Sequence, residues 1–206
     1  MKTRRFLLAA GFVLAMAFTL SCSTDPDSGG GYTGSYGSIE YGGKTYKTVE
    51  IGTQTWFAEN LNYDPGTGNS ACYDNRASNC DIYGRLYDWS TAMGVCPSGW
   101  HLPNKNAEWD VLMTAVGGSS TAGTKLKAAS GWNSNGNGTN DYGFSALPGG
   151  YGYSDGDFSN VGSSGNWWSA SESDIGGAYS RGMDGNFASW NGYSKGFLFS
   201  VRCVQD

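Results

Sequence analysis

Charged side chains are scarce in this sequence. Only 15% of its 206 residues are Asp, Glu, Lys or Arg, and the formal net charge at pH 7 is -5. Binding to nucleic acid phosphates needs a basic surface, so this balance argues against nucleic acid as a partner. Apart from the N-terminal stretch, the chain also lacks a long apolar run, and that stretch is short for a membrane-spanning helix.

Enzyme signatures are equally sparse. His101 is the single histidine, and the chain contains neither a P-loop nor an HExxH pair. A histidine without a second histidine or an evident nucleophile beside it is usually a structural residue. We therefore expect no enzymatic activity, no catalytic residue and no cofactor.

Glycine and aromatic residues are abundant instead. The chain has 33 glycines, and 15% of its residues are Phe, Trp or Tyr. Disordered chains are poor in aromatic residues, and helical ones avoid glycine. The composition predicts one loop-rich domain with a core of large rings, preceded by a leader.

The N-terminus has the pattern of an export signal. Three basic residues precede the apolar run Phe6 to Leu20, which ends in Thr-Leu-Ser-Cys22 and is similar to a bacterial lipobox. We expect residues 1–21 to be a lipoprotein signal peptide, Cys22 to carry the lipid, and residues 22–37 to be a flexible Gly/Ser linker. The protein would then be anchored to the cell envelope, at the outer membrane or cell surface. Ordinary secretory cleavage with a spare Cys22 is the alternative.

The other four cysteines predict disulfides, because export leads to an oxidising compartment. Four cysteines allow three pairings. Cys72 and Cys80 bracket a polar loop that could close locally, and Cys96 with Cys203 would tie a helical turn to the last strand. Zinc is the rival interpretation, but the spacing does not match paired CxxC ligands.

Apolar periodicity predicts two or three short helices. The first contains Leu86, Trp89 and Met93, and the second contains the stripe Trp109, Leu112, Met113 and Val116 with an N-cap at Asn104 or Asn106. A third is expected over 121–129. Two or three strands are expected between Ile39 and Tyr63, and further strands over 144–148, 167–172, 178–183, 187–190 and 197–204. In the last of these, alternation directs Phe197, Phe199, Val201 and Cys203 inward and Leu198, Ser200, Arg202 and Val204 outward.

Several blocks of sequence carry a family resemblance. The segments KTVEIGTQTWFAENLNY, YGRLYDW, CPSGWHLP, AEW, FSALPGG, WWSASE and FSVRCV resemble, in this order, the Fibrobacter succinogenes major paralogous domain, a module of exported bacterial proteins, over about residues 38–206. Fewer positions resemble the C-type lectin-like fold: Trp89, Ala92, Cys96, Gly99, Leu102, Glu108, Leu112 and Cys203. The resemblance implies an α+β domain in which short helices pack on small antiparallel sheets with long Gly-rich loops. It also implies the Cys96–Cys203 disulfide.

The chain departs from the functional patterns of that fold. Calcium-dependent sugar binders use a Glu-Pro-Asn or Gln-Pro-Asp loop and a Trp-Asn-Asp strand, whereas here the nearest match is Trp190-Asn191-Gly192. Formylglycine-generating enzymes, which have a related fold, need an active-site cysteine pair that this chain does not leave free. The fold therefore does not bring a function with it.

The candidate ligand-binding residues are aromatic and lie in the Gly-rich C-terminal half. Rings on loops can stack on sugars or anchor a protein partner. Trp168 and Trp190 are expected in the core, whereas the candidates for binding are Tyr151, Tyr153, Trp167, Tyr179 and Tyr193.

Short acidic turns offer a second kind of site. Asp155, Asp157 and Asp184 place carboxylates near glycine and asparagine, and we interpret them as plain turn chemistry, with calcium binding as the alternative. Taken together, the sequence predicts a surface binding or adhesion module for a glycan or a protein. A structural envelope protein without a small ligand is the alternative.

Overall fold

The computed structural model describes residues 31–206, and it consists mainly of strands with a few short helices. The expected α+β class is confirmed. The expected signal peptide, Cys22 as the expected lipidation site and the first part of the expected linker lie outside the described residues. Within residues 31–206, no helix is long and apolar enough to cross a membrane.

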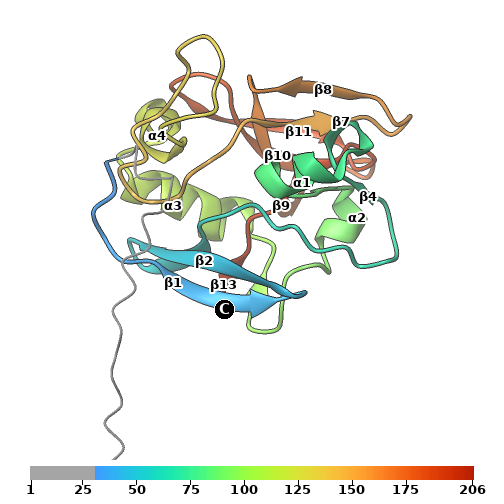
Figure 1. Ribbon diagram of the computed structural model, residues 1–206, viewed down its shortest axis with the longest axis horizontal. Coiled ribbons are helices and arrows are strands. Elements are labelled where there is room, and N and C mark those ends of the chain that lie inside the picture. The colour runs from blue at the N-terminus through green and yellow to red at the C-terminus, as the bar shows by residue number, and fades with distance from the viewer. Residues whose placement is uncertain (1–30) are drawn as a thin grey trace, which may run out of the picture.

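The strands form two sheets (Figure 1). The first has the order β1-β2-β3-β13-β6. Its members are β1 (Gly37–Tyr41), β2 (Lys44–Ile51), β3 (Gln54–Phe57), β13 (Val204–Gln205) and β6 (Trp100–His101). Because β13 pairs with both β3 and β6, the end of the chain is held between its beginning and its middle.

The second sheet has the order β11-β10-β9-β12-β5-β4, and in addition β7 pairs with β9 and β8 pairs with β7. These strands are β4 (Ser70–Ala71), β5 (Leu86–Tyr87), β7 (Gly149–Gly152), β8 (Phe158–Val161), β9 (Gly165–Glu172), β10 (Gly177–Met183), β11 (Ala188–Ser194) and β12 (Phe199–Ser200). Most pairs are antiparallel, whereas β9 runs parallel to β7 and β12.

A tight turn sets the register of the first hairpin. Tyr41 pairs with Lys44, so the loop contains only Gly42 and Gly43, with φ of 58° and 79°. Positive φ at both positions matches the twist of the flanking strands, and glycine adopts it without a Cβ clash. A Cβ on Gly42 would lie 2.5 Å from the Tyr63 ring.

The helices are short, and apolar side chains from residues 109–116 share a core with strands of both sheets. They are the 3-10 turn η1 (Tyr73–Asn75), α1 (Ala77–Tyr83), α2 (Trp89–Ala92), the π-helical turn η2 (Lys105–Trp109), α3 (Asp110–Ala115) and α4 (Ser119–Leu126). Asn104 is the N-cap of η2, since its side chain accepts hydrogen bonds from the backbone N–H groups of Asn106 and Ala107. Glu108 reciprocates by accepting the Asn104 N–H at 2.5 Å, as in a capping box.

Two apolar cores lie on either side of the C-terminal strand segment. One contains Trp56, Trp109, Phe144 and Trp167, and the other contains Phe57, Tyr87, Trp168 and Phe199. The expected alternation correctly places Phe199, Val201 and Cys203 in the second core. The opposite set is also buried, with Ser200 at 1%, Arg202 at 0% and Val204 at 1% exposure, so the expectation that these residues face solvent is wrong.

Three other expectations were wrong for tertiary reasons. Leu86 belongs to strand β5, because it pairs with Ala71 and Ser200, and not to the first helix. The segment 144–148 forms only one bridge, between Ala146 and Lys127, and no strand. Conversely, the Gly-rich stretch after it forms the β7–β8 hairpin where a loop was expected.

Candidate ligand-binding surface

Three of the five predicted binding residues come together around one ring. Tyr151 lies in β7, Tyr153 follows it and Tyr193 lies in β11, and their ring centroids are 6.1, 5.3 and 5.4 Å from that of Phe197. We call these four residues the tyrosine cluster. All four are partly buried, so each ring packs on its neighbours and still reaches the surface. Rings fixed in this way offer contact area with little loss of side-chain entropy on binding.

Two phenol groups of the cluster are linked by a hydrogen bond. The Tyr151 and Tyr153 hydroxyls are 3.2 Å apart, and Asn160 Nδ2 donates to the Tyr151 hydroxyl at 3.4 Å. The hydrogen bond with Tyr151 raises the pKa of Tyr153, and burial raises the pKa of Tyr193. Both phenols can therefore donate as well as accept hydrogen bonds.

A polar groove opens beside Tyr153. Its volume is about 520 Å³, and it lies between the η1 turn and the β7–β8 hairpin. The lining side chains that can form hydrogen bonds are Asp74, Asn75, Arg76, Tyr153, Asp157 and Ser159. The sequence reasoning did not select the first three. The only signal was their place in the polar loop between Cys72 and Cys80, which had been considered as a disulfide loop alone.

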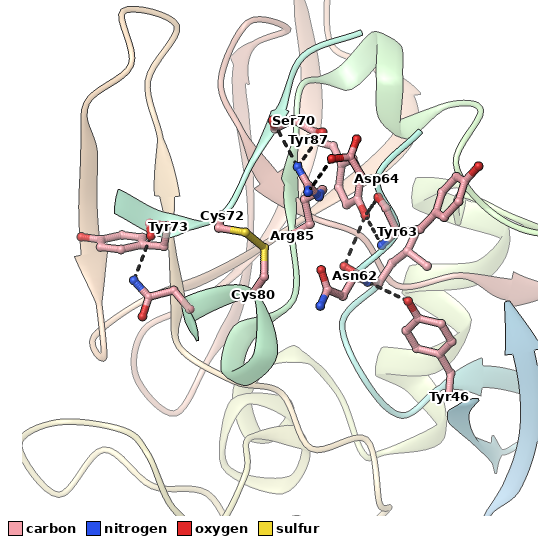
Figure 2. The surroundings of a disulfide bond; sticks show 12 residues. Tyr46, Asn62, Tyr63, Asp64, Ser70, Cys72, Tyr73, Cys80, Arg85 and Tyr87 are labelled. Atoms are coloured by element: carbon pink, nitrogen blue, oxygen red, sulfur yellow. Dashed lines mark hydrogen bonds and ion pairs between the residues drawn. A yellow bond between two sulfur atoms is a disulfide. The ribbon is translucent and has the colours of Figure 1, made fainter. Parts of the chain in front are cut away.

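A disulfide fixes one wall of this groove (Figure 2). Cys72 and Cys80 are bonded as predicted, and they flank the η1 turn. Tyr73 is buried between them and the hairpin, where its ring centroid is 5.3 Å from that of Phe158. Its carbonyl accepts from Asn79 Nδ2 at 2.8 Å. The wall is therefore fixed from both sides.

The second predicted disulfide, between Cys96 and Cys203, is also present. It joins the turn after α2 to the segment just before β13, across 107 residues of sequence. Cys203 is fully buried in the core that contains Phe199.

Trp167 does not belong to the binding surface. It is fully buried, and its Nε1 donates to Asn60 Oδ1 at 2.8 Å, so its selection as a ligand contact is corrected. Trp168 is buried as expected and donates to the Tyr87 carbonyl at 2.8 Å. Trp167 and Trp168 are both buried because each face of β9 is covered by an apolar core. The alternation rule predicts one exposed face, which applies only to a strand with a core on one side.

Tyr179 lies in a separate cluster on the outer strands. Its ring centroid is 6.0 Å from that of Trp190, and Lys105 Nζ lies 4.1 Å from the Tyr179 centroid. Trp190 is only partly buried, in contrast to the core position expected for it. Its Nε1 and the Arg181 guanidinium both donate to Asp110 Oδ1, at 2.9 and 2.7 Å. Burial lowers the pKa of Arg181 to about 10, which still leaves it charged at neutral pH.

The acidic calcium candidates lie in two different turns. Asp155 and Asp157 belong to the β7–β8 turn, where Asp155 Oδ1 accepts from the Asp157 N–H at 3.3 Å. Asp184 is exposed in the turn between β10 and β11. Among residues 31–206, no three His, Cys, Asp or Glu side chains are grouped so that they could hold a metal ion.

His101 contacts two carboxylates at the surface. Its Nδ1 lies 2.7 Å from Asp206 Oδ1, and its Nε2 lies 3.7 Å from Glu108 Oε1. The side chain is 42% exposed, and these contacts connect Asp206 to Glu108 in η2. The arrangement fits the structural role expected for this residue.

Two pentapeptides match the Gly-x-Ser-x-Gly pattern of serine hydrolases, at 152–156 and 192–196. In those enzymes the serine sits on a sharp turn from a strand into a helix. Here the first pentapeptide starts at the last residue of β7 and forms the β7–β8 turn, whereas the second starts within β11 and ends in the turn after it. Neither leads into a helix. Ser194 Oγ accepts from the Gly196 N–H at 3.4 Å, so its hydroxyl stabilises the turn.

A known protein family matches the part of the chain that forms this architecture. The model of the Fibrobacter succinogenes major domain matches residues 49–205, which is most of the chain. The chain belongs to this family. The matched residues of this Fibrobacter succinogenes major domain include both disulfides, the tyrosine cluster and the residues that line the groove. No curated protein and no solved structure matches the chain.

Proposed function

We propose that this chain is an exported, lipid-anchored surface module that binds a ligand through the tyrosine cluster and the groove beside it. The observation that carries the proposal is the convergence of Tyr151, Tyr153 and Tyr193 on Phe197. These residues come from β7, the turn after it and β11, and one of them, Tyr153, also lines the polar groove. Binding sites usually combine several partly exposed aromatic rings with a small number of polar groups in defined positions.

The described chain begins near α4. Gly31, the first described residue, donates to the Thr139 carbonyl at 2.8 Å, and the Thr139 N–H donates to the Thr124 carbonyl in α4. In Figure 1, α4 lies on the left of the domain and the β7–β8 hairpin on the right. A flexible N-terminal linker would therefore join the domain on the side away from this hairpin and leave it accessible.

The finer assignment to the C-type lectin-like fold is also part of the proposal. It is supported by the Cys96–Cys203 disulfide and by the position of β13 between β3 and β6, which brings both chain ends into one sheet. A structural envelope protein is the second candidate. It is favoured by the complete burial of Trp56, Trp109, Trp167 and Trp168, since rings in a core are not available to a ligand.

Replacing a cluster tyrosine should weaken binding without unfolding the domain. We expect Tyr153→Ala and Tyr193→Ala in the full-length protein to reduce binding to glycans or to whole envelopes at least tenfold, or about 1.4 kcal/mol. Tyr142→Ala is the matched control, because Tyr142 is a partly buried ring that packs on the other core. Glycan arrays and envelope pull-downs, run with calcium and with a chelator, give the measurement. Equal binding by all three variants would favour the structural role.

Lipidation gives a separate prediction about location. In an exporting bacterial host, Cys22→Ser should move the protein from the membrane fraction to the soluble periplasmic or secreted fraction, because the acyl chains are lost. Membrane retention by the Cys22→Ser variant would contradict the lipid anchor. Replacement of nearby Ser23 by Ala is the control and should leave the fractionation unchanged.

A further inference from the structure

We infer that the groove beside Tyr153 binds an uncharged segment of a glycan. This inference rests on the proposed binding function and adds the class of ligand and the residues that recognise it. One wall consists of Asp74, Asn75 and Arg76, and the other of Tyr153, Asp157 and Ser159. The groove therefore joins an aromatic ring to acceptors and donors on two separate elements.

The side chains of the η1 wall are free to contact a ligand. Asp74, Asn75 and Arg76 are exposed, and within residues 31–206 none of their side chains forms a hydrogen bond or an ion pair. Their backbone, in contrast, is fixed. The Asn75 N–H donates to the Cys72 carbonyl at 2.8 Å, and the Arg76 N–H donates to the Tyr73 carbonyl at 3.2 Å.

The conformation of this wall is unusual for residues other than glycine. Asp74 and Asn75 have φ of 53° and 55°, in the left-handed region that most side chains avoid. Such residues persist when the surroundings hold them, and they cluster at ligand-binding positions. Here the Cys72–Cys80 disulfide and the buried Tyr73 supply that restraint. A pre-organised wall lowers the entropic cost of binding.

The opposite wall is also held by backbone hydrogen bonds. The Tyr153 N–H donates to the Asp157 carbonyl at 2.8 Å, and the Gly156 N–H donates to the Tyr153 carbonyl at 3.2 Å. These bonds close the β7–β8 turn, and Phe197 supports the Tyr153 ring at 5.3 Å between centroids. The ring is thus a fixed platform at one end of the groove.

This combination suits a sugar better than a protein surface. A pyranose ring has an apolar C–H face that can stack on an aromatic ring and a rim of hydroxyls that donate and accept. Asp74 and Asp157 can accept from such hydroxyls, and Arg76 can donate to them as a charge-assisted partner. The centre of a protein interface is, in contrast, poor in charged residues. The two carboxylates outnumber the one guanidinium, so an anionic glycan would be repelled.

The test uses the full-length protein with two sets of soluble oligosaccharides. Uncharged gluco-, manno-, xylo- and galacto-oligosaccharides form the first set, and oligogalacturonates form the anionic comparison. Affinities are measured by isothermal titration calorimetry. We expect at least one uncharged oligosaccharide to bind, and Asp74→Asn and Arg76→Ala each to weaken that binding at least tenfold. Asp81→Asn is the control, because Asp81 is exposed in the adjacent α1 and does not line the groove.

The outcomes separate this inference from the proposed function. If Tyr193→Ala abolishes binding while Asp74→Asn and Arg76→Ala bind normally, the groove assignment is overturned and the tyrosine cluster stands. If no uncharged oligosaccharide binds, or if only oligogalacturonates do, the glycan class is wrong; loss of envelope binding in Tyr193→Ala would then point to a protein partner. If Tyr153→Ala and Tyr193→Ala also bind envelopes normally, both proposals fail.

Discussion

Replacement of Arg202 by alanine should lower the free energy of unfolding by about 3–5 kcal/mol. Arg202 is fully buried, and its guanidinium donates to the Phe57 carbonyl at 3.0 Å, to the Ser145 carbonyl at 2.9 Å and also to the Phe144 carbonyl. Its Nε donates to Asn60 Oδ1 at 2.7 Å. Removing the side chain takes the guanidinium donors away from these carbonyls and creates a cavity, although Asn60 Oδ1 still accepts from Trp167 Nε1.

The charge itself is tolerated because the guanidinium donates four hydrogen bonds and lies over a ring. The Arg202 guanidinium carbon is 4.5 Å from the Phe144 centroid. Burial lowers the pKa of Arg202 to about 9, which keeps the group protonated at neutral pH. The planar guanidinium of Arg202 thereby connects the C-terminal strand segment to β3 and to residues 144–145. Lysine has no such fork, so Arg202→Lys should also destabilise the protein.

Urea unfolding followed by tryptophan fluorescence measures the Arg202 effect. Arg76→Ala is the matched control, since Arg76 is exposed. Its free energy of unfolding should differ from that of the wild type by no more than about 0.5 kcal/mol. An Arg202→Ala midpoint equal to that of wild type would show that the buried network does not stabilise the fold.

Removal of the Cys96–Cys203 disulfide should destabilise the protein by a similar amount. The bond spans 107 residues, and in the chain-entropy model a loop of that size restricts the unfolded chain by about 4–5 kcal/mol. A single domain is usually stable by only about 5–15 kcal/mol. The double variant Cys96→Ala/Cys203→Ala should therefore unfold at a much lower urea concentration.

The second disulfide provides the internal comparison. Cys72 and Cys80 are separated by only 8 residues, for which the same model gives about 2.5 kcal/mol. Cys72→Ala/Cys80→Ala should thus be the more stable of the two double variants, and it should mainly affect ligand binding by loosening the η1 wall. The reverse order of stability would indicate that native-state contacts, and not loop entropy, dominate both effects.

Local sequence patterns predicted the features that depend on neighbouring residues. The Asn104 cap and the third helix, expected over 121–129 and found over 119–126, follow from short-range chemistry. The even set of four cysteines predicted disulfides but allowed three pairings, and the family resemblance implied the Cys96–Cys203 pair that is present. The tyrosines of the binding surface could also be selected, because they stand beside glycine and serine in the C-terminal half.

The tertiary structure decided which residues of those patterns are buried and which are exposed. Arg202 was assigned to the solvent side because strand alternation assumes one buried face, whereas here a core lies on each side of the strand. Trp167 was misplaced for the same reason. The groove depends on a contact between residues 74–76 and residues 153–159, and nothing in either segment indicates the other. The sequence alone thus determined the family, the turns and the cross-links. Only the packing of the two sheets decided what is buried and which polar residues meet, because these depend on contacts between segments distant in the chain.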